Sequence, residues 1–134
     1  MFIGETQIRV RYAETDQMGY VYYGNYPQYY EVGRVEAMRQ LGMPYKKLEE
    51  NGIMLPVSNL TVKYLKPAYY DDLLTIKTSI KKIPEVRIEF DYEIFNEKEI
   101  LLNKGSTTLV FVDLKSGRPT MAPTEMIDAI KEFF

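Results

Sequence analysis

One segment with helical periodicity lies near the N-terminus, and it is the feature that most constrains the fold. Apolar and small residues recur every three or four positions through residues 26–41, which is the spacing of one helix face. Asn25 is a candidate N-cap with Gln28 as its capping-box partner, and Gly42 and Pro44 end the segment. About sixteen residues at about 1.5 Å each predict a rod of roughly 24 Å, long enough to cross a small sheet.

Five other segments alternate between apolar and polar residues, and each predicts a strand with one buried face. One precedes the helix, and four follow it: residues 7–12, 58–65, 73–80, 86–95 and about 100–112. Strands with one polar face are typical of an antiparallel sheet, and the short turns between them favour a meander. Gly105 is a candidate β-bulge, and residues from Thr124 onward predict a short amphipathic helix.

These segments predict one α+β domain over residues 1–134, with a curved antiparallel sheet of about five strands wrapped around one long central helix. The 134 residues are 46% hydrophobic and 27% charged, and no linker or repeat divides them. One helix cannot cover a whole five-stranded sheet, so a free edge or face should bind another copy. We therefore expect a homodimer or a homotetramer.

The charge and residue content exclude several classes of function. A net charge of −2 with scattered Lys and Arg predicts no nucleic-acid binding, which needs a concentrated basic surface. No run approaches the roughly 18 apolar residues of a membrane span, so we expect no stable membrane insertion. The sequence has no Cys, which excludes disulfides and thiolate metal sites and fits a reducing compartment. A cytoplasmic location is the expectation.

The absence of histidine narrows the chemistry further. It excludes Ser-His-Asp and Cys-His nucleophile systems and most zinc hydrolase sites. Any catalysis must use carboxylates, hydroxyls, amides, Lys or Arg. The segment between the first strand and the helix holds one candidate, Asp16, although residues 15–19 also have the composition of a turn in which Asp16 is a turn residue.

Two blocks of residues place this candidate in a wider pattern. The first block contains Tyr12, Asp16, Gly19, Val21, Tyr23, Asn25 and Tyr26, followed by Tyr30, Glu31 and Arg34. The second, residues 64–74, reads YLKPAYYDDLL. Together they resemble the hotdog-fold thioesterases of the 4-hydroxybenzoyl-CoA thioesterase class over nearly the whole chain. The resemblance implies a hotdog fold, hydrolysis of acyl-CoA thioesters, and active sites formed between paired subunits.

The resemblance also implies roles for two residues. Asp16 falls on the family's catalytic carboxylate, and Tyr23 falls where a backbone N–H at the start of the central helix binds the thioester carbonyl. Unpaired N–H groups at a helix N-terminus stabilise a developing oxyanion. Asp16 then either attacks as a nucleophile or activates water as a general base. Many bacterial relatives carry His in place of Tyr23, but the backbone N–H is independent of the side chain.

Further residues are candidates for substrate contact: Gly19, Tyr22, Asn25, Tyr26, Lys66 and Arg87. Gly19 has an alternative role in turn geometry. Lys66 and Arg87 carry the charge to meet the phosphates of coenzyme A. Glu31 on the helix is a reserve carboxylate, and it is also spaced to pair with Arg34 on the helix surface.

The sequence therefore predicts an acyl-CoA thioesterase that uses no metal or separate cofactor, since coenzyme A enters as part of the substrate. An acyl-carrier-protein thioesterase is one alternative, although the sequence lacks the basic docking patch that it would favour. A non-catalytic acyl-CoA-binding module is another. Asp16 argues against that module, because a passive pocket gains nothing from desolvating a carboxylate beside a carbonyl. The acyl group stays open.

Overall fold

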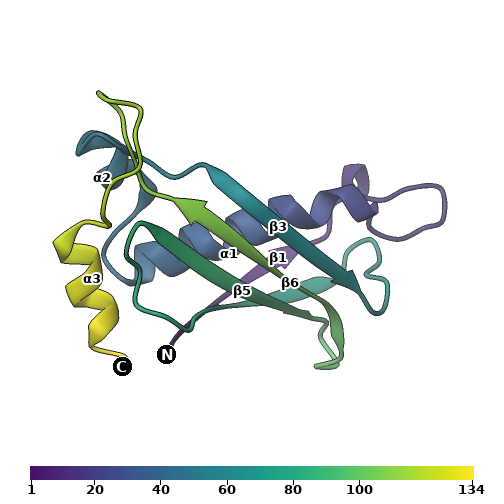
Figure 1. The fold of residues 1–134 in the computed structure, drawn as a ribbon. Helices are drawn as coiled ribbons and strands as arrows, with labels where there is room; N and C mark the ends of the chain where they lie inside the picture. The colour runs from purple at the N-terminus through teal and green to yellow at the C-terminus, as the bar shows by residue number, and fades with distance from the viewer.

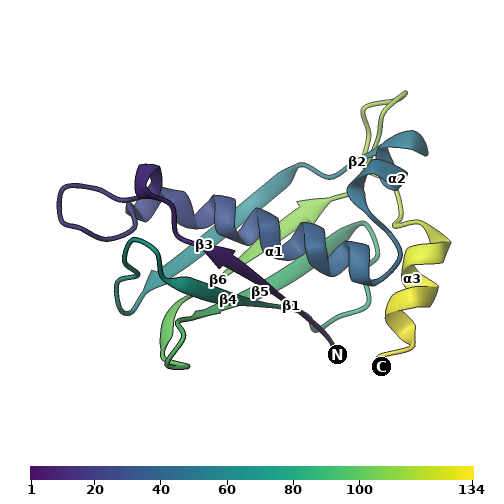
Figure 2. The same cartoon turned by 180° about the vertical axis from the view of Figure 1, so that it is seen from behind.

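A computed structural model describes residues 1–134 and contains one five-stranded antiparallel sheet with a long helix across one face. Figure 2 shows this helix, α1 (Tyr26–Gln40), lying across one face of the sheet, and Figure 1 shows no helix over the opposite face. The strands are β1 (Phe2–Arg9), β3 (Val57–Tyr64), β4 (Leu73–Ile80), β5 (Arg87–Phe95) and β6 (Leu101–Val110). The predicted α+β arrangement of one helix and about five strands is confirmed.

The strand order differs from a simple meander. The sheet runs β1-β4-β5-β6-β3, so only β4, β5 and β6 follow one another as hairpins. Strand β3 pairs with β6, with Lys63 opposite Lys104, and forms one edge of the sheet. Residues 65–72, between β3 and β4, form a connection longer than a hairpin turn. This connection leads the chain from one edge of the sheet toward the other and passes the Asp16 loop, since the N–H of Val21 donates to the Ala68 carbonyl at 2.8 Å.

Two local predictions were wrong. The first strand spans Phe2–Arg9 rather than residues 7–12, and Tyr12 lies outside it, exposed in a 3-10 turn (Tyr12–Glu14). No β-bulge occurs at Gly105, because the register shifts lie at the ends of β3 and β5. A Cβ on Gly105 would lie 2.5 Å from the Tyr30 hydroxyl oxygen. Glycine is present because the Tyr30 side chain of α1 passes close to the strand.

The remaining elements close the end of the molecule away from the start of α1 (Figure 1). They are α2 (Tyr45–Glu50), the two-stranded pair β2 (Ile53–Met54) and β7 (Val112–Asp113), and α3 (Thr124–Lys131). The predicted C-terminal helix is therefore confirmed. The amino group of Met1 donates to the carbonyl of Phe133 at 2.7 Å, so the two termini lie together. No helix has the length and apolar character needed to span a bilayer.

The core holds α1 tightly on the sheet. The rings of Tyr30 and Tyr92 stack with centroids 4.3 Å apart, and a Cβ on Gly33 would lie 2.6 Å from the Thr78 hydroxyl oxygen. Arg34 does not pair with Glu31 as one prediction had it, since its Nε donates to the Tyr45 hydroxyl at 3.1 Å. Close packing of this kind fixes helices in one position. The N-terminus of α1 is thereby held beside the loop that carries Asp16.

Candidate active site

A cleft of about 350 Å³ lies between the Asp16 loop, the start of α1 and the end of β3. It is mainly apolar and contains one anion and one cation, as is typical of small-molecule sites. The lining residues are Asp16, Met18, Tyr20, Val21, Tyr23, Tyr26, Tyr64, Leu65, Lys66 and Pro67. Four of the predicted site residues, Asp16, Tyr23, Tyr26 and Lys66, are thus brought together.

Asp16 has both a turn role and a free oxygen. Its Oδ1 accepts the backbone N–H of Met18 at 2.8 Å, and its carbonyl accepts the N–H of Gly19 at 3.0 Å. Gly19 has φ 85°, a conformation that glycine adopts without steric cost, so its role is in the turn. The second carboxylate oxygen of Asp16, Oδ2, has no hydrogen-bond partner. The turn therefore orients the carboxylate without using all its acceptor capacity.

The 3-10 turn Tyr23–Asn25, directly before α1, supplies an unused donor in the cleft that Asp16 also lines. The N–H of Tyr22 donates to the Glu14 carbonyl and the N–H of Asn25 to the Tyr22 carbonyl, each at 2.9 Å. The N–H of Tyr23, between them, has no acceptor in a hydrogen bond. The Tyr23 carbonyl accepts the hydroxyl of Tyr64 at 2.9 Å, which fixes the peptide segment. An unpaired N–H at a helix start is the group that an oxyanion requires.

Tyrosines form much of the cleft wall. Tyr26 is buried, its ring lies 5.5 Å from that of Tyr64, and burial raises the pKa of Tyr26 to about 12. Its hydroxyl is therefore neutral at ordinary pH. Tyr22 is not among the lining residues, but its ring contacts that of Tyr23 at 4.6 Å. The adjacent Tyr23 hydroxyl raises the pKa of Tyr22, and the negative charge of Asp16 adds a smaller effect.

Asn25 has a different role from the predicted cap. Its side-chain Nδ2 donates to the carbonyl of Glu14 at 2.8 Å, and it makes no capping bond to α1. The physical reason is its helical backbone, with φ −86° and ψ −14°, whereas a capping residue needs an extended one. Asn25 ties the helix start to the turn before Asp16 and does not line the cleft.

Two predicted residues lie outside this cleft. Arg87, at the start of β5, lines a separate hollow that it shares with Lys82 and Glu89. Glu31 lines another hollow of about 280 Å³, beside Val57 and Leu60 of β3. Neither side chain joins Asp16 within one chain, because the spacing along a strand or helix places them in other regions of the surface.

Glu14 was not predicted as a site residue. Its side chain is buried, and its backbone carbonyl accepts hydrogen bonds from Tyr22 and Asn25, on either side of Tyr23. A signal was present, since Glu14 follows Arg11 at the three-residue spacing of a turn-capping acid. No three or more acidic residues gather into a group that could hold a metal ion.

Comparison with known proteins defines the family. Residues 10–132 match the model described as Thioesterase-like superfamily. The acyl-CoA thioester hydrolase YbgC of Escherichia coli is 31% identical over 93% of this chain and 93% of its own. The crystal structure of DHNA-CoA thioesterase from Staphylococcus aureus is 36% identical, with a TM-score of 0.93 over 99% of this chain and 91% of its own.

A plant relative also matches. The chloroplastic acyl-acyl carrier protein thioesterase ATL2 of Arabidopsis thaliana is 36% identical over 91% of this chain, which corresponds to 65% of its own length. From the family match and these identities, the chain belongs to the thioesterase-like superfamily. The resemblance and the hotdog fold predicted from the two sequence blocks are confirmed. The predicted class, an acyl-CoA thioester hydrolase, agrees with the bacterial relatives.

Proposed function

We propose that this chain hydrolyses acyl-CoA thioesters in the cleft beside Asp16. The observation that carries the proposal is the pairing, at one cleft, of a carboxylate oxygen and a helix-terminal N–H that both lack partners. Thioester hydrolysis needs these two groups, one to attack or to activate water and one to stabilise the oxyanion. A thiolate leaves readily, so Asp16 needs no imidazole beside it.

Two routes fit this arrangement. As a nucleophile, Asp16 bonds to the acyl carbon while the carbon–sulfur bond breaks, and water then cleaves the anhydride. As a general base, Asp16 removes a proton from the water that attacks the carbonyl. In both routes the N–H of Tyr23 receives the charge that develops on oxygen. Rapid quenching of a single turnover and mass spectrometry separate them, since only the first adds an acyl group to Asp16.

The rest of the cleft supports an acyl-CoA substrate. The rings of Tyr23, Tyr26 and Tyr64 offer apolar walls for an acyl group, aliphatic or aromatic. Lys66 is the cation among the lining residues, and we propose that it binds a phosphate of coenzyme A. We propose that no metal or separate cofactor takes part, so that EDTA leaves the rate unchanged.

We further propose that the active form is a homodimer built on the edge of β3. This edge has no neighbouring strand, and Val57 and Leu60 at its surface are 47% and 41% exposed. They border the hollow that contains Glu31, so a second copy would cover apolar surface and unpaired backbone groups together. Sedimentation equilibrium should give twice the 15.7 kDa chain mass or, for the tetramer, four times it. A monomer that is fully active would contradict the proposal.

Release of free thiol from a panel of thioesters tests the function. The panel contains short, long and aromatic acyl-CoAs and the matching acyl carrier protein thioesters. Comparing the two sets distinguishes an acyl-CoA thioesterase from an acyl-carrier-protein thioesterase. The chain has no Cys, so a thiol-reactive dye detects only the liberated product. Turnover of acyl-CoA supports the proposal, and faster turnover of the carrier-protein thioesters would favour the plant-like activity. Tight binding without turnover would indicate a binding module.

We propose a cytoplasmic location, which cell fractionation checks.

A further inference from the structure

Glu14 is a buried carboxylate two residues before Asp16, and it is absent from the predicted site. Only 6% of the residue is exposed. Burying a charged carboxylate is unfavourable unless hydrogen bonds and an opposite charge compensate it. The contacts that compensate Glu14 therefore show what the residue holds in place.

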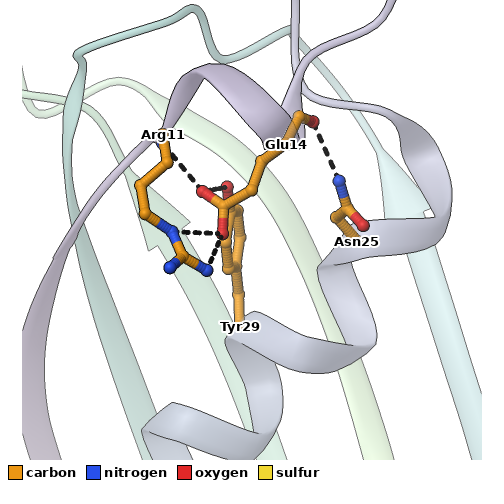
Figure 3. Close-up of polar contacts among 4 residues, drawn as sticks. All are labelled: Arg11, Glu14, Asn25 and Tyr29. Atoms are coloured by element: carbon orange, nitrogen blue, oxygen red, sulfur yellow. Dashed lines mark hydrogen bonds and ion pairs between the residues drawn. The ribbon is translucent and has the colours of Figure 1, made fainter.

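The carboxylate joins two parts of the chain (Figure 3). Its Oε1 accepts the backbone N–H of Arg11 at 2.8 Å and the hydroxyl of Tyr29 at 3.1 Å. Its Oε2 accepts Nη2 of Arg11 at 3.2 Å, and Nε of the same side chain lies at 3.4 Å. Arg11 belongs to the turn that leads into the Asp16 loop, whereas Tyr29 belongs to the first turn of α1.

The backbone carbonyl of Glu14 makes a second connection. It accepts the N–H of Tyr22 at 2.9 Å and Nδ2 of Asn25 at 2.8 Å. These two donors lie on either side of Tyr23, whose own N–H has no acceptor. One residue thus contacts the segment before Asp16, the segment around Tyr23 and the body of α1.

Closing the 3-10 turn does not account for these contacts. That turn needs only the bonds between Arg11 and Glu14, which are three residues apart. The hydroxyl of Tyr29 is fifteen residues from Glu14 in sequence and comes from another element. Burial and the nearby Glu14 charge raise the pKa of Tyr29, so its hydroxyl stays protonated and donates to the carboxylate.

We propose that Glu14 is a positioning residue that holds Asp16 and the N–H of Tyr23 at a fixed separation for thioester hydrolysis. The inference rests on the proposed function, because it concerns the same two groups. Glu14 does not line the cleft, so it acts through the residues that it binds. Misplacement of reacting groups by about 1 Å lowers rates by about a hundredfold, so loosening this connection should appear in kcat.

Tyr29→Phe is the test variant with the least risk to folding. It removes the hydroxyl that links α1 to Glu14. The ring stays in the core, and all bonds between Glu14 and Arg11 are kept. Glu14→Gln is the second variant, in which an amide nitrogen faces the Arg11 donors in place of a carboxylate oxygen. Tyr92→Phe is the matched control, because it also removes a buried tyrosine hydroxyl, bonded to the Thr107 hydroxyl at 2.6 Å, away from the cleft.

Each variant is measured for kcat by thiol release, for Kd of a non-hydrolysable acyl-CoA thioether, and for melting temperature. We expect kcat of Tyr29→Phe to fall at least about tenfold with Kd within about twofold, while Tyr92→Phe loses stability but not kcat. Two results would overturn the inference. The first is a kcat within about twofold of wild type in both Glu14→Gln and Tyr29→Phe. The second is that Tyr29→Phe and Tyr92→Phe lose kcat and analogue binding to the same extent. If the wild-type protein releases no thiol, the proposed function is wrong and this inference fails with it. That result is seen before any variant is compared.

Discussion

Replacing Gly105 by alanine should destabilise the protein, against the usual preference of strands. Alanine within a strand is normally favoured over glycine by about 0.5–1 kcal/mol, because glycine loses more conformational freedom on folding. At this position, however, a Cβ would lie 2.4 Å from the carbonyl oxygen of Thr61 and 2.5 Å from the hydroxyl oxygen of Tyr30. One neighbour is backbone of the paired strand β3, and the other belongs to a buried ring of the central helix. Neither is the end of a flexible side chain.

The size of the effect follows from this crowding. Overpacked core substitutions cost about 1–3 kcal/mol, and the two short contacts at Gly105 place it at the upper end of that range, about 2–3 kcal/mol. At about 2.1 cal/mol/K per residue, a chain of this length has an unfolding entropy of about 0.28 kcal/mol/K. The melting temperature should therefore fall by about 7–11 °C.

Calorimetry of wild type and Gly105→Ala measures this change directly. Gly4→Ala is the control, since a Cβ there would meet the Gln40 side-chain oxygen at 2.8 Å and Ala37 Cβ at 3.1 Å. The Gln40 side chain can move away, so the loss at Gly4 should be clearly smaller. An unchanged or raised melting temperature for Gly105→Ala would refute the claim that Tyr30 and β3 are packed against this glycine.

Two further predictions concern pH and substrate binding. Burial raises the pKa of Tyr26 and of Tyr92 to about 12 each, above the ordinary value of about 10, so the folded state holds their protons more tightly. The free energy of unfolding should therefore not depend on these groups below about pH 10, and it should fall as the pH rises from about 10 to 12. Urea unfolding across this pH range measures the change. A urea midpoint that stays constant would contradict the prediction. Lys66→Ala should raise KM for an acyl-CoA about fivefold, or about 1 kcal/mol, with kcat unchanged, whereas Lys82→Ala, outside the cleft, should change neither. Equal KM values for the two variants would exclude Lys66 as a phosphate contact.

Much of the fold could be predicted because the relevant signals are local. The period of three to four residues marked α1, and strict alternation marked β4 with its bounds, since both patterns reflect which side chains face the core. The strand order could not be predicted in this way. The pairing of β3 with β6 brings together residues 39 to 52 positions apart, and alternation says nothing about which strand is the neighbour.

The site was predictable to a similar degree. Asp16 and Tyr23 were predicted from the motif, and Tyr26 and Lys66 share their cleft. Arg87 and Glu31 lie in other hollows because a charge pattern does not specify the distance between elements. Glu14 was missed because its contacts to Tyr29 and Asn25 come from other elements, and sequence spacing does not show them.

The most direct test of the central claim is kcat for thiol release by wild type and Asp16→Asn at saturating acyl-CoA, with Glu31→Gln as the matched carboxylate control. The asparagine keeps an oxygen to accept the Met18 N–H, so the turn should survive while the nucleophile or base is lost. We expect kcat to fall at least about a hundredfold in Asp16→Asn with substrate binding retained, and to stay close to wild type in Glu31→Gln. Equal turnover by wild type and Asp16→Asn, with the loss in Glu31→Gln instead, would contradict the account.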